Sequence, residues 1–144
     1  MTRDIDVVVE IMNEDVNRLV SLFEKDFYIE RGAVEEAIAV RGMFNIIHNA
    51  YVLKVDFIVR KDSAFRELEF GRRRKIELEG VPMWIVSPED LILSKLFWAK
   101  ESSSEMQIKD VENLLRMVSD LDVSYIEHWV SSLGLEDIYQ MARQ

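Results

Sequence analysis

The feature that most restricts the fold is a short run near the start in which acidic and β-branched residues alternate. In residues 3–9, written RDIDVVV, Asp4 and Asp6 occupy every second position. This alternation predicts a strand that begins at about Arg3, with both carboxylates on one face, and Thr2 shares their parity. Two carboxylates a few ångströms apart repel, so one pKa should rise unless a cation lies between them. A divalent metal ion is the usual solution. The alternative is that the pair lies on the exposed face of an edge strand.

The next eighty residues mix helix and strand patterns. Asn13 offers a helix cap before an apolar helical repeat, and Gly42 suits the left-handed end of the following helix. A short connection at residues 49–50 makes a hairpin plausible, and Gly80–Pro82 predicts a second turn. We therefore expect helices over 16–23, 33–40 and 62–71, and strands over 43–48, 51–59, 76–78 and 83–86.

The last third of the sequence contains only helix patterns. Ser87 is an N-cap signal with Pro88 at the first helical position, and that helix should run to about residue 100. A second helix follows over 105–118. Ser124 with Glu127 forms a capping box for a third helix, which Gly134 ends, and a short amphipathic helix completes the chain. We expect an α+β fold, with a mixed β-sheet and flanking helices in residues 1–86 and a C-terminal helical part in residues 87–144.

Composition excludes several classes of protein. The chain has 144 residues, 18 of them basic and 27 acidic, and a formal charge of −9. This acidic balance disfavours general nucleic-acid binding, although residues 60–75 are locally basic and suit either a solvated helix face or phosphate attraction. The absence of cysteine excludes disulfides, thiolate metal sites and thiol nucleophiles. The longest apolar runs fall far short of the ~20 residues that a bilayer requires, and no apolar leader opens the chain. We therefore expect a cytoplasmic protein without a membrane partner.

A third carboxylate strengthens the metal hypothesis. Asp56 lies inside the apolar strand pattern of residues 52–59, where an unpaired carboxylate is costly. If that strand lies beside the strand of Asp4 and Asp6, the three form a cluster. Such a cluster binds one or two Mg²⁺ ions, or Mn²⁺, and orients a nucleoside triphosphate for in-line attack. The opposing possibility is an acidic structural domain whose carboxylates are surface groups.

Three ordered segments together resemble a known superfamily. They are residues 2–9 (TRDIDVVV), residues 54–58 (KVDFI) and residues 87–96 (SPEDLILSKL). This set is similar to the nucleotidyltransferase superfamily related to DNA polymerase β, close to small prokaryotic AbiEii-type and minimal nucleotidyltransferase-like proteins. The resemblance implies that Asp4, Asp6 and Asp56 are the catalytic metal carboxylates. It implies that Thr2, Lys95 and Asp110 belong to the substrate site, with Lys95 near the nucleotide phosphates.

One departure from the resembled family leaves two functions open. Active members carry a Gly-Ser or Gly-Gly turn upstream of the aspartate strand to hold the triphosphate, and only residues 1–3 precede Asp4 here. Either the true start lies upstream, or the nucleotide site has been lost. The first function is Mg²⁺-dependent transfer of a nucleoside monophosphate from an NTP to a hydroxyl on RNA or protein, in a toxin–antitoxin context. The second is a catalytically degenerate interaction module that binds an antitoxin-type partner or another copy of itself.

Overall fold

The computed structural model describes residues 3–144 of the chain, and Thr2 lies outside them. The chain divides into two compact units, Met1–Glu67 and Leu68–Gln144. The predicted boundary lay after residue 86, whereas residues 68–86 group with the C-terminal helices in the structure. Helix α3 (Ala64–Gly71) includes this boundary.

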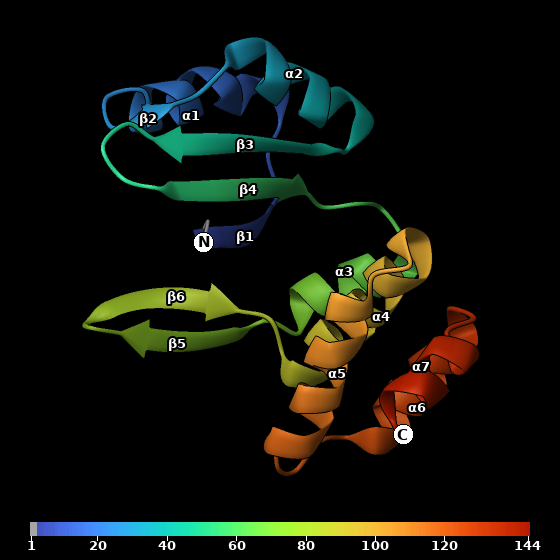
Figure 1. The fold of residues 1–144 in the computed structure, drawn as a ribbon. Coiled ribbons are helices and arrows are strands. Elements are labelled where there is room, and N and C mark those ends of the chain that lie inside the picture. Colours follow the sequence, from blue (N-terminus) through green and yellow to red (C-terminus); the bar gives the residue numbers. More distant parts are fainter. Residues whose placement is uncertain (1–2) are drawn as a thin grey trace. The chain divides into compact units, whose positions relative to one another are not determined.

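The first unit contains a mixed β-sheet, as predicted, and this sheet has four strands (Figure 1). Its strand order is β1-β4-β3-β2, in which β1 is parallel to β4 and the other neighbours are antiparallel. The hairpin predicted at residues 49–50 connects β3 to β4, whereas the two-residue β2 was not predicted. The elements are β1 (Arg3–Val9), the 3-10 helix η1 (Asn13–Asp15), α1 (Val16–Phe23), β2 (Phe27–Tyr28), α2 (Arg31–Val40), β3 (Met43–His48) and β4 (Leu53–Val59).

One face of this sheet packs against α1 and α2. The stacked rings of Phe44 and Phe57 lie at its centre, with centroids 5.0 Å apart. Because side chains alternate along a strand, the residues between these core positions point to the opposite face. That opposite face carries Asp4, Asp6 and Asp56. The buried core residues are Val16, Val34, Ala37, Phe44, Ile46, Val55, Phe57 and Val59.

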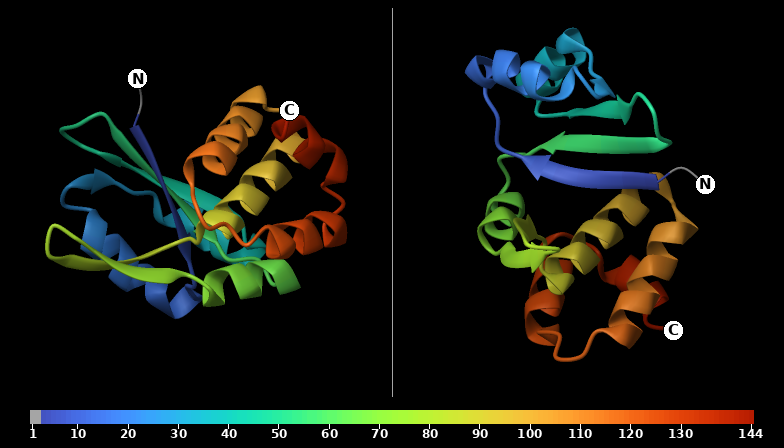
Figure 2. Two further views of the ribbon diagram at one scale, coloured as in Figure 1. Left: turned by 90° about the horizontal axis from the view of Figure 1, so that it is seen from below. Right: turned by 90° about the vertical axis from the view of Figure 1, so that its left-hand side faces the viewer.

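The second unit is a two-stranded sheet followed by helices. Helix α4 contacts the three helices that follow it, and these helices are drawn together in the left view of Figure 2. The apolar side of α4 is fully buried at Ile92, Leu93 and Leu96. No helix within residues 3–144 has the length and apolar character needed to cross a bilayer. The elements are β5 (Arg74–Leu78), β6 (Val81–Ile85), α4 (Pro88–Ser102), α5 (Glu105–Met117), α6 (Val123–Ser132) and α7 (Glu136–Ala142).

Two predicted helix caps in the first unit were wrong by one residue. Asn13 lies inside η1, whose N-cap is Met12, because the Asp15 carboxylate accepts from the Met12 N–H at 2.8 Å. Arg41, with φ of 48°, takes the left-handed position predicted for Gly42.

Of the remaining cap and turn predictions, some are confirmed and others are displaced by one or two residues. The cap of α6 is Asp122 rather than Ser124, since its carboxylate accepts from the Tyr125 N–H at 2.9 Å. The second hairpin turns at Glu79–Gly80, and Pro82 lies inside β6. The Ser87 cap and the left-handed Gly134 are confirmed.

Candidate functional site

The three predicted carboxylates lie on one face of two neighbouring strands. Asp6 and Asp56 are register partners in the parallel pair of β1 and β4, and Asp4 lies two residues before Asp6 on the same face. Neighbouring strands are about 4.8 Å apart, so Asp6 and Asp56 lie side by side in the sheet. The expectation that these two strands are neighbours is therefore confirmed.

Asp56 is the most enclosed of the three. Its side chain is only 13% exposed, whereas the side chain of Asp4 is 45% exposed. The Asp56 Oδ1 atom is buried and has no hydrogen-bond partner among the described residues. A buried carboxylate oxygen without a partner costs free energy, which a bound cation would recover.

A lysine on the same face supplies the cation that the repelling carboxylates need. Lys54 is the register partner of Asp4 and lies two residues before Asp56. Its Nζ atom lies 3.1 Å from Asp56 Oδ2 and 3.7 Å from Asp4 Oδ2. The hydrogen bond to Asp56 is the main cause that raises the pKa of Lys54, and the negative charges of Asp56 and Asp4 raise it further against the cost of burial. The sequence analysis missed this role, although the i, i+2 spacing of Lys54 and Asp56 places both on one face.

The polar row continues onto a third strand. Asn45 of β3 is the register partner of Asp56 on the side away from Asp6. Asn45 is exposed, so its amide offers a donor and an acceptor beside the carboxylates. The row Asp6–Asp56–Asn45 crosses β1, β4 and β3.

The donor set suits a hard divalent cation, because the three acids offer oxygen ligands. Within residues 3–144, no three acidic or histidine side chains converge closely enough to hold a metal ion as they stand. The ammonium between Asp4 and Asp56 gives a physical reason, since it holds these oxygens at distances suited to a lysine. The buried Asp56 Oδ1 nevertheless remains an unsatisfied acceptor at this place.

The other predicted site residues lie elsewhere or outside the described chain. Thr2 is not among the described residues. Lys95 and Asp110 are brought together in the second unit, where Lys95 Nζ lies 2.7 Å from Asp110 Oδ2 and 3.1 Å from Gln107 Oε1. Because Lys95 is paired within its own unit, a role at the nucleotide phosphates stays a prediction.

The SPED segment that contributed to the resemblance forms a buried hydrogen-bond network. Asp90 is fully buried and accepts from Ser87 Oγ at 2.7 Å, Arg72 Nε at 3.1 Å and the Tyr125 hydroxyl at 2.6 Å. Glu89 accepts from the Asp122 N–H at 3.1 Å. Arg74 of β5 also pairs with Glu89 at 3.6 Å, so this segment joins β5, α4 and α6 of the second unit by hydrogen bonds and ion pairs.

Most of the arginines in the locally basic stretch 60–75 are engaged within the protein. Arg60 forms a bidentate ion pair with Glu10 at the ends of β4 and β1. Arg73 donates to the Phe70 carbonyl and lies over the rings of Phe70 and Trp84, and Arg74 pairs with Glu89. These arginines therefore contribute to the structure, and phosphate attraction by this stretch stays a prediction.

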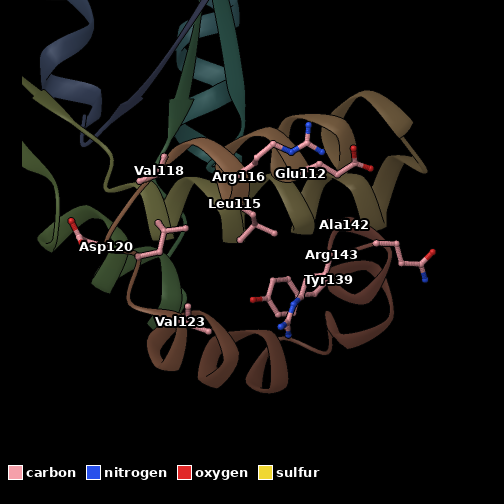
Figure 3. Close-up of a pocket in the computed structure, with 11 residues that line it drawn as sticks. Glu112, Leu115, Arg116, Val118, Asp120, Val123, Tyr139, Ala142 and Arg143 are labelled. Carbon is pink, nitrogen blue, oxygen red and sulfur yellow. The ribbon is translucent and has the colours of Figure 1, made fainter.

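A separate open pocket of about 720 Å³ lies among α5, α6 and α7 (Figure 3). Leu115 and Tyr139 are among its lining residues, and Glu112, Arg116 and Arg143 contribute charges of both signs. None of the residues predicted from the sequence lines it. We therefore place the candidate site on the carboxylate face of the first unit.

Comparison with known proteins gives no assignment. Neither a protein-family model nor a curated protein sequence matches the chain.

Proposed function

We propose that the carboxylate face of β1 and β4 binds a divalent cation, Mg²⁺ or Mn²⁺. With this ion bound, the protein would transfer a nucleoside monophosphate from an NTP to a hydroxyl on RNA or protein. The observation that carries the proposal is the register of the parallel pair. It sets Asp6 beside Asp56, with Asp4 on the same face and the Asp56 Oδ1 atom unpartnered. The resemblance to the nucleotidyltransferase superfamily points to the same three residues.

Each acid has a distinct part in this proposal. Asp56 is held rigidly by its burial in the sheet, so it fixes where the ion would bind. Asp4 and Asp6 are exposed and supply further oxygen ligands. A Mg²⁺ ion held by these acids would supply positive charge that offsets the charge on the phosphate oxygens.

The proposed transfer needs a base for the attacking hydroxyl, and it forms one bond and breaks another. An exposed carboxylate, Asp4 or Asp6, accepts the proton of the attacking hydroxyl. The new bond joins that hydroxyl oxygen to the α-phosphorus. The bond from the α-phosphorus to the bridging oxygen breaks, so pyrophosphate leaves with its electron pair.

Lys54 favours a second candidate, an interaction module that works without metal. Its ammonium already pairs with two of the acids, so the repulsion between Asp4 and Asp56 is relieved with no ion bound. In this case the unit would bind an antitoxin-type protein or another copy of the chain. Substituting Asp4 and Asp6 by Asn would then leave partner binding intact.

A transfer assay separates the two candidates. The full chain is incubated with each α-³²P-labelled NTP, Mg²⁺, and either RNA or a protein acceptor. We expect label on a macromolecule, abolished by Asp56→Asn and unchanged by Asp26→Asn, an exposed acid of the same unit. Absence of label with all four NTPs, together with partner binding that survives Asp4→Asn and Asp6→Asn, would favour the interaction module.

A further inference from the structure

The ammonium of Lys54 lies where a metal ion shared by Asp4 and Asp56 would have to bind. It lies between Asp4 and Asp56, at 3.7 Å and 3.1 Å from one oxygen of each. We infer that Lys54 is an internal counter-ion that a divalent cation must displace, so that the lysine sets how readily the site takes up its metal. This inference rests on the proposed function, because it assumes that these carboxylates are the metal ligands.

Distance makes the two cations mutually exclusive. Mg²⁺ holds carboxylate oxygens at about 2.0–2.1 Å, much closer than the ammonium does here. Asp56 is enclosed and Asp4 is largely open, so Asp4 is the ligand that has to move toward the ion. An ammonium left between them would face the divalent cation at short range, and like charges at such distances repel strongly.

The side chain of Lys54 is able to leave. It is 31% exposed, which gives its end group access to solvent. Its unbranched stem has four rotatable bonds and carries a well-hydrated charge. The backbone of β4 can therefore stay fixed while the ammonium swings out.

Two properties follow from this arrangement. Without metal, Lys54 relieves the repulsion between Asp4 and Asp56, so the sheet folds without an ion. With metal, part of the binding free energy is spent on breaking the pairs to Lys54, so the native lysine weakens the affinity.

The test is a titration with Mn²⁺ followed by electron paramagnetic resonance, which reports the free ion. It compares the native chain with Lys54→Met, Lys54→Arg and Lys61→Met. Lys61 is an exposed lysine just beyond β4, so its substitution removes the same charge outside the carboxylate pair. We expect the Kd for Mn²⁺ to fall by about tenfold in Lys54→Met, equivalent to 1.4 kcal/mol.

The other variants sharpen this result. Lys54→Arg keeps the charge and offers a fork that can pair with carboxylates, so its Kd should not fall. Lys61→Met should stay within about twofold of the native chain, because an exposed charge is screened. Circular dichroism should show that Lys54→Met melts at a lower temperature in chelator and recovers when Mn²⁺ is added.

The outcomes separate the inference from the proposed function. If the native chain binds Mn²⁺ through the acids but Lys54→Met binds no more tightly, the inference is wrong and the metal site stands. If only Lys54→Met binds, and Asp56→Asn removes that binding, Lys54 blocks the site and the native chain is the metal-free module. If neither binds, both the inference and the metal site are wrong.

Discussion

Asp90 is a fully buried carboxylate whose charge is matched by three side-chain donors, from Ser87, Arg72 and Tyr125. Asp90→Ala leaves the guanidinium and the phenol without their acceptor. We expect the free energy of unfolding to fall by about 3 kcal/mol. This is the lower end of the range for a broken buried pair, because Arg72 keeps about a third of its side-chain surface in solvent. Urea unfolding followed by circular dichroism measures the change.

The matched control is Asp137→Asn, which alters an exposed acid of the same unit. It should change the free energy of unfolding by no more than about 0.5 kcal/mol. Equal losses in the two variants would show that the Asp90 network does not stabilise the fold.

Because of Tyr125, the free energy of unfolding should depend on pH in the alkaline range. Burial, and then the hydrogen bond to Asp90, raise the pKa of the Tyr125 hydroxyl far above its ordinary value of 10.0. Above pH 10 the unfolded chain releases this proton while the folded chain keeps it, so the free energy of unfolding falls as pH rises. Below pH 10 both states keep the proton, and this contribution is complete.

Urea unfolding at about pH 8 and about pH 11 measures how much stability the native chain and Tyr125→Phe each lose as pH rises. The variant should lose less stability between the two pH values than the native chain. Some loss should persist in the variant, because burial also raises the pKa of Tyr139. Identical losses in both proteins would contradict the assignment to Tyr125.

At the scale of elements, two serines at helix starts differ in what they contribute. Ser87 caps α4 and accepts from the Asp90 N–H at 3.2 Å, whereas Ser104 precedes α5 without a side-chain cap hydrogen bond. Ser87→Ala removes both this cap and the hydroxyl that donates to the buried Asp90 carboxylate, so it should lower the free energy of unfolding by about 2 kcal/mol. Ser104→Ala should lie within about 0.5 kcal/mol of the native chain. Thermal and urea unfolding of the two variants compare them directly, and a larger loss in Ser104→Ala would overturn the assignment.

The second hairpin turns through two residues with positive φ. Glu79 has φ of 50° and Gly80 has φ of 79°, a conformation that asparagine tolerates better than glutamate. Glu79→Asn should raise the free energy of unfolding by about 0.5 kcal/mol. Glu77→Asn, placed within β5, should not raise it, because asparagine is a poor strand residue. Urea unfolding decides, and a loss of stability in Glu79→Asn would contradict this turn geometry.

The sequence predicted most elements because their patterns are local. Alternation identified β1, an apolar run identified β4, and the Ser87–Pro88 signal identified the start of α4. The wrong cap of α6 has a clear cause, since two polar residues competed at its start. Asp122 and Ser124 were both able to cap α6, and only the packed structure selects between them. The short β2 was missed because two residues carry no periodic signal.

At the scale of the whole molecule, parity placed the acids correctly but could not supply their partners. Strand alternation put Asp4 and Asp6 on one face, and the burial cost of Asp56 indicated that it needed a neighbour. The register that sets Asp6 beside Asp56 depends on tertiary pairing, which no local pattern contains. For the same reason the pair of Lys95 with Asp110, which joins α4 to α5, was not visible in the sequence.

The unit boundary also depends on non-local pairing. Strands β5 and β6 read as further strands of the first sheet, and the boundary was placed after them. They pair only with each other among the described residues, and residues 68–86 belong to the second unit. The site itself is unaffected, because Asp4, Asp6 and Asp56 all lie in the first unit.

The central claim is that these three carboxylates together bind a divalent cation, and calorimetric titration of Mg²⁺ into the full chain tests it most directly. The account predicts one saturable site in the native chain. The site is lost in the double variant Asp4→Asn/Asp6→Asn and retained in Asp26→Asn. No binding heat in the native chain, or equal binding in the double variant, would contradict it.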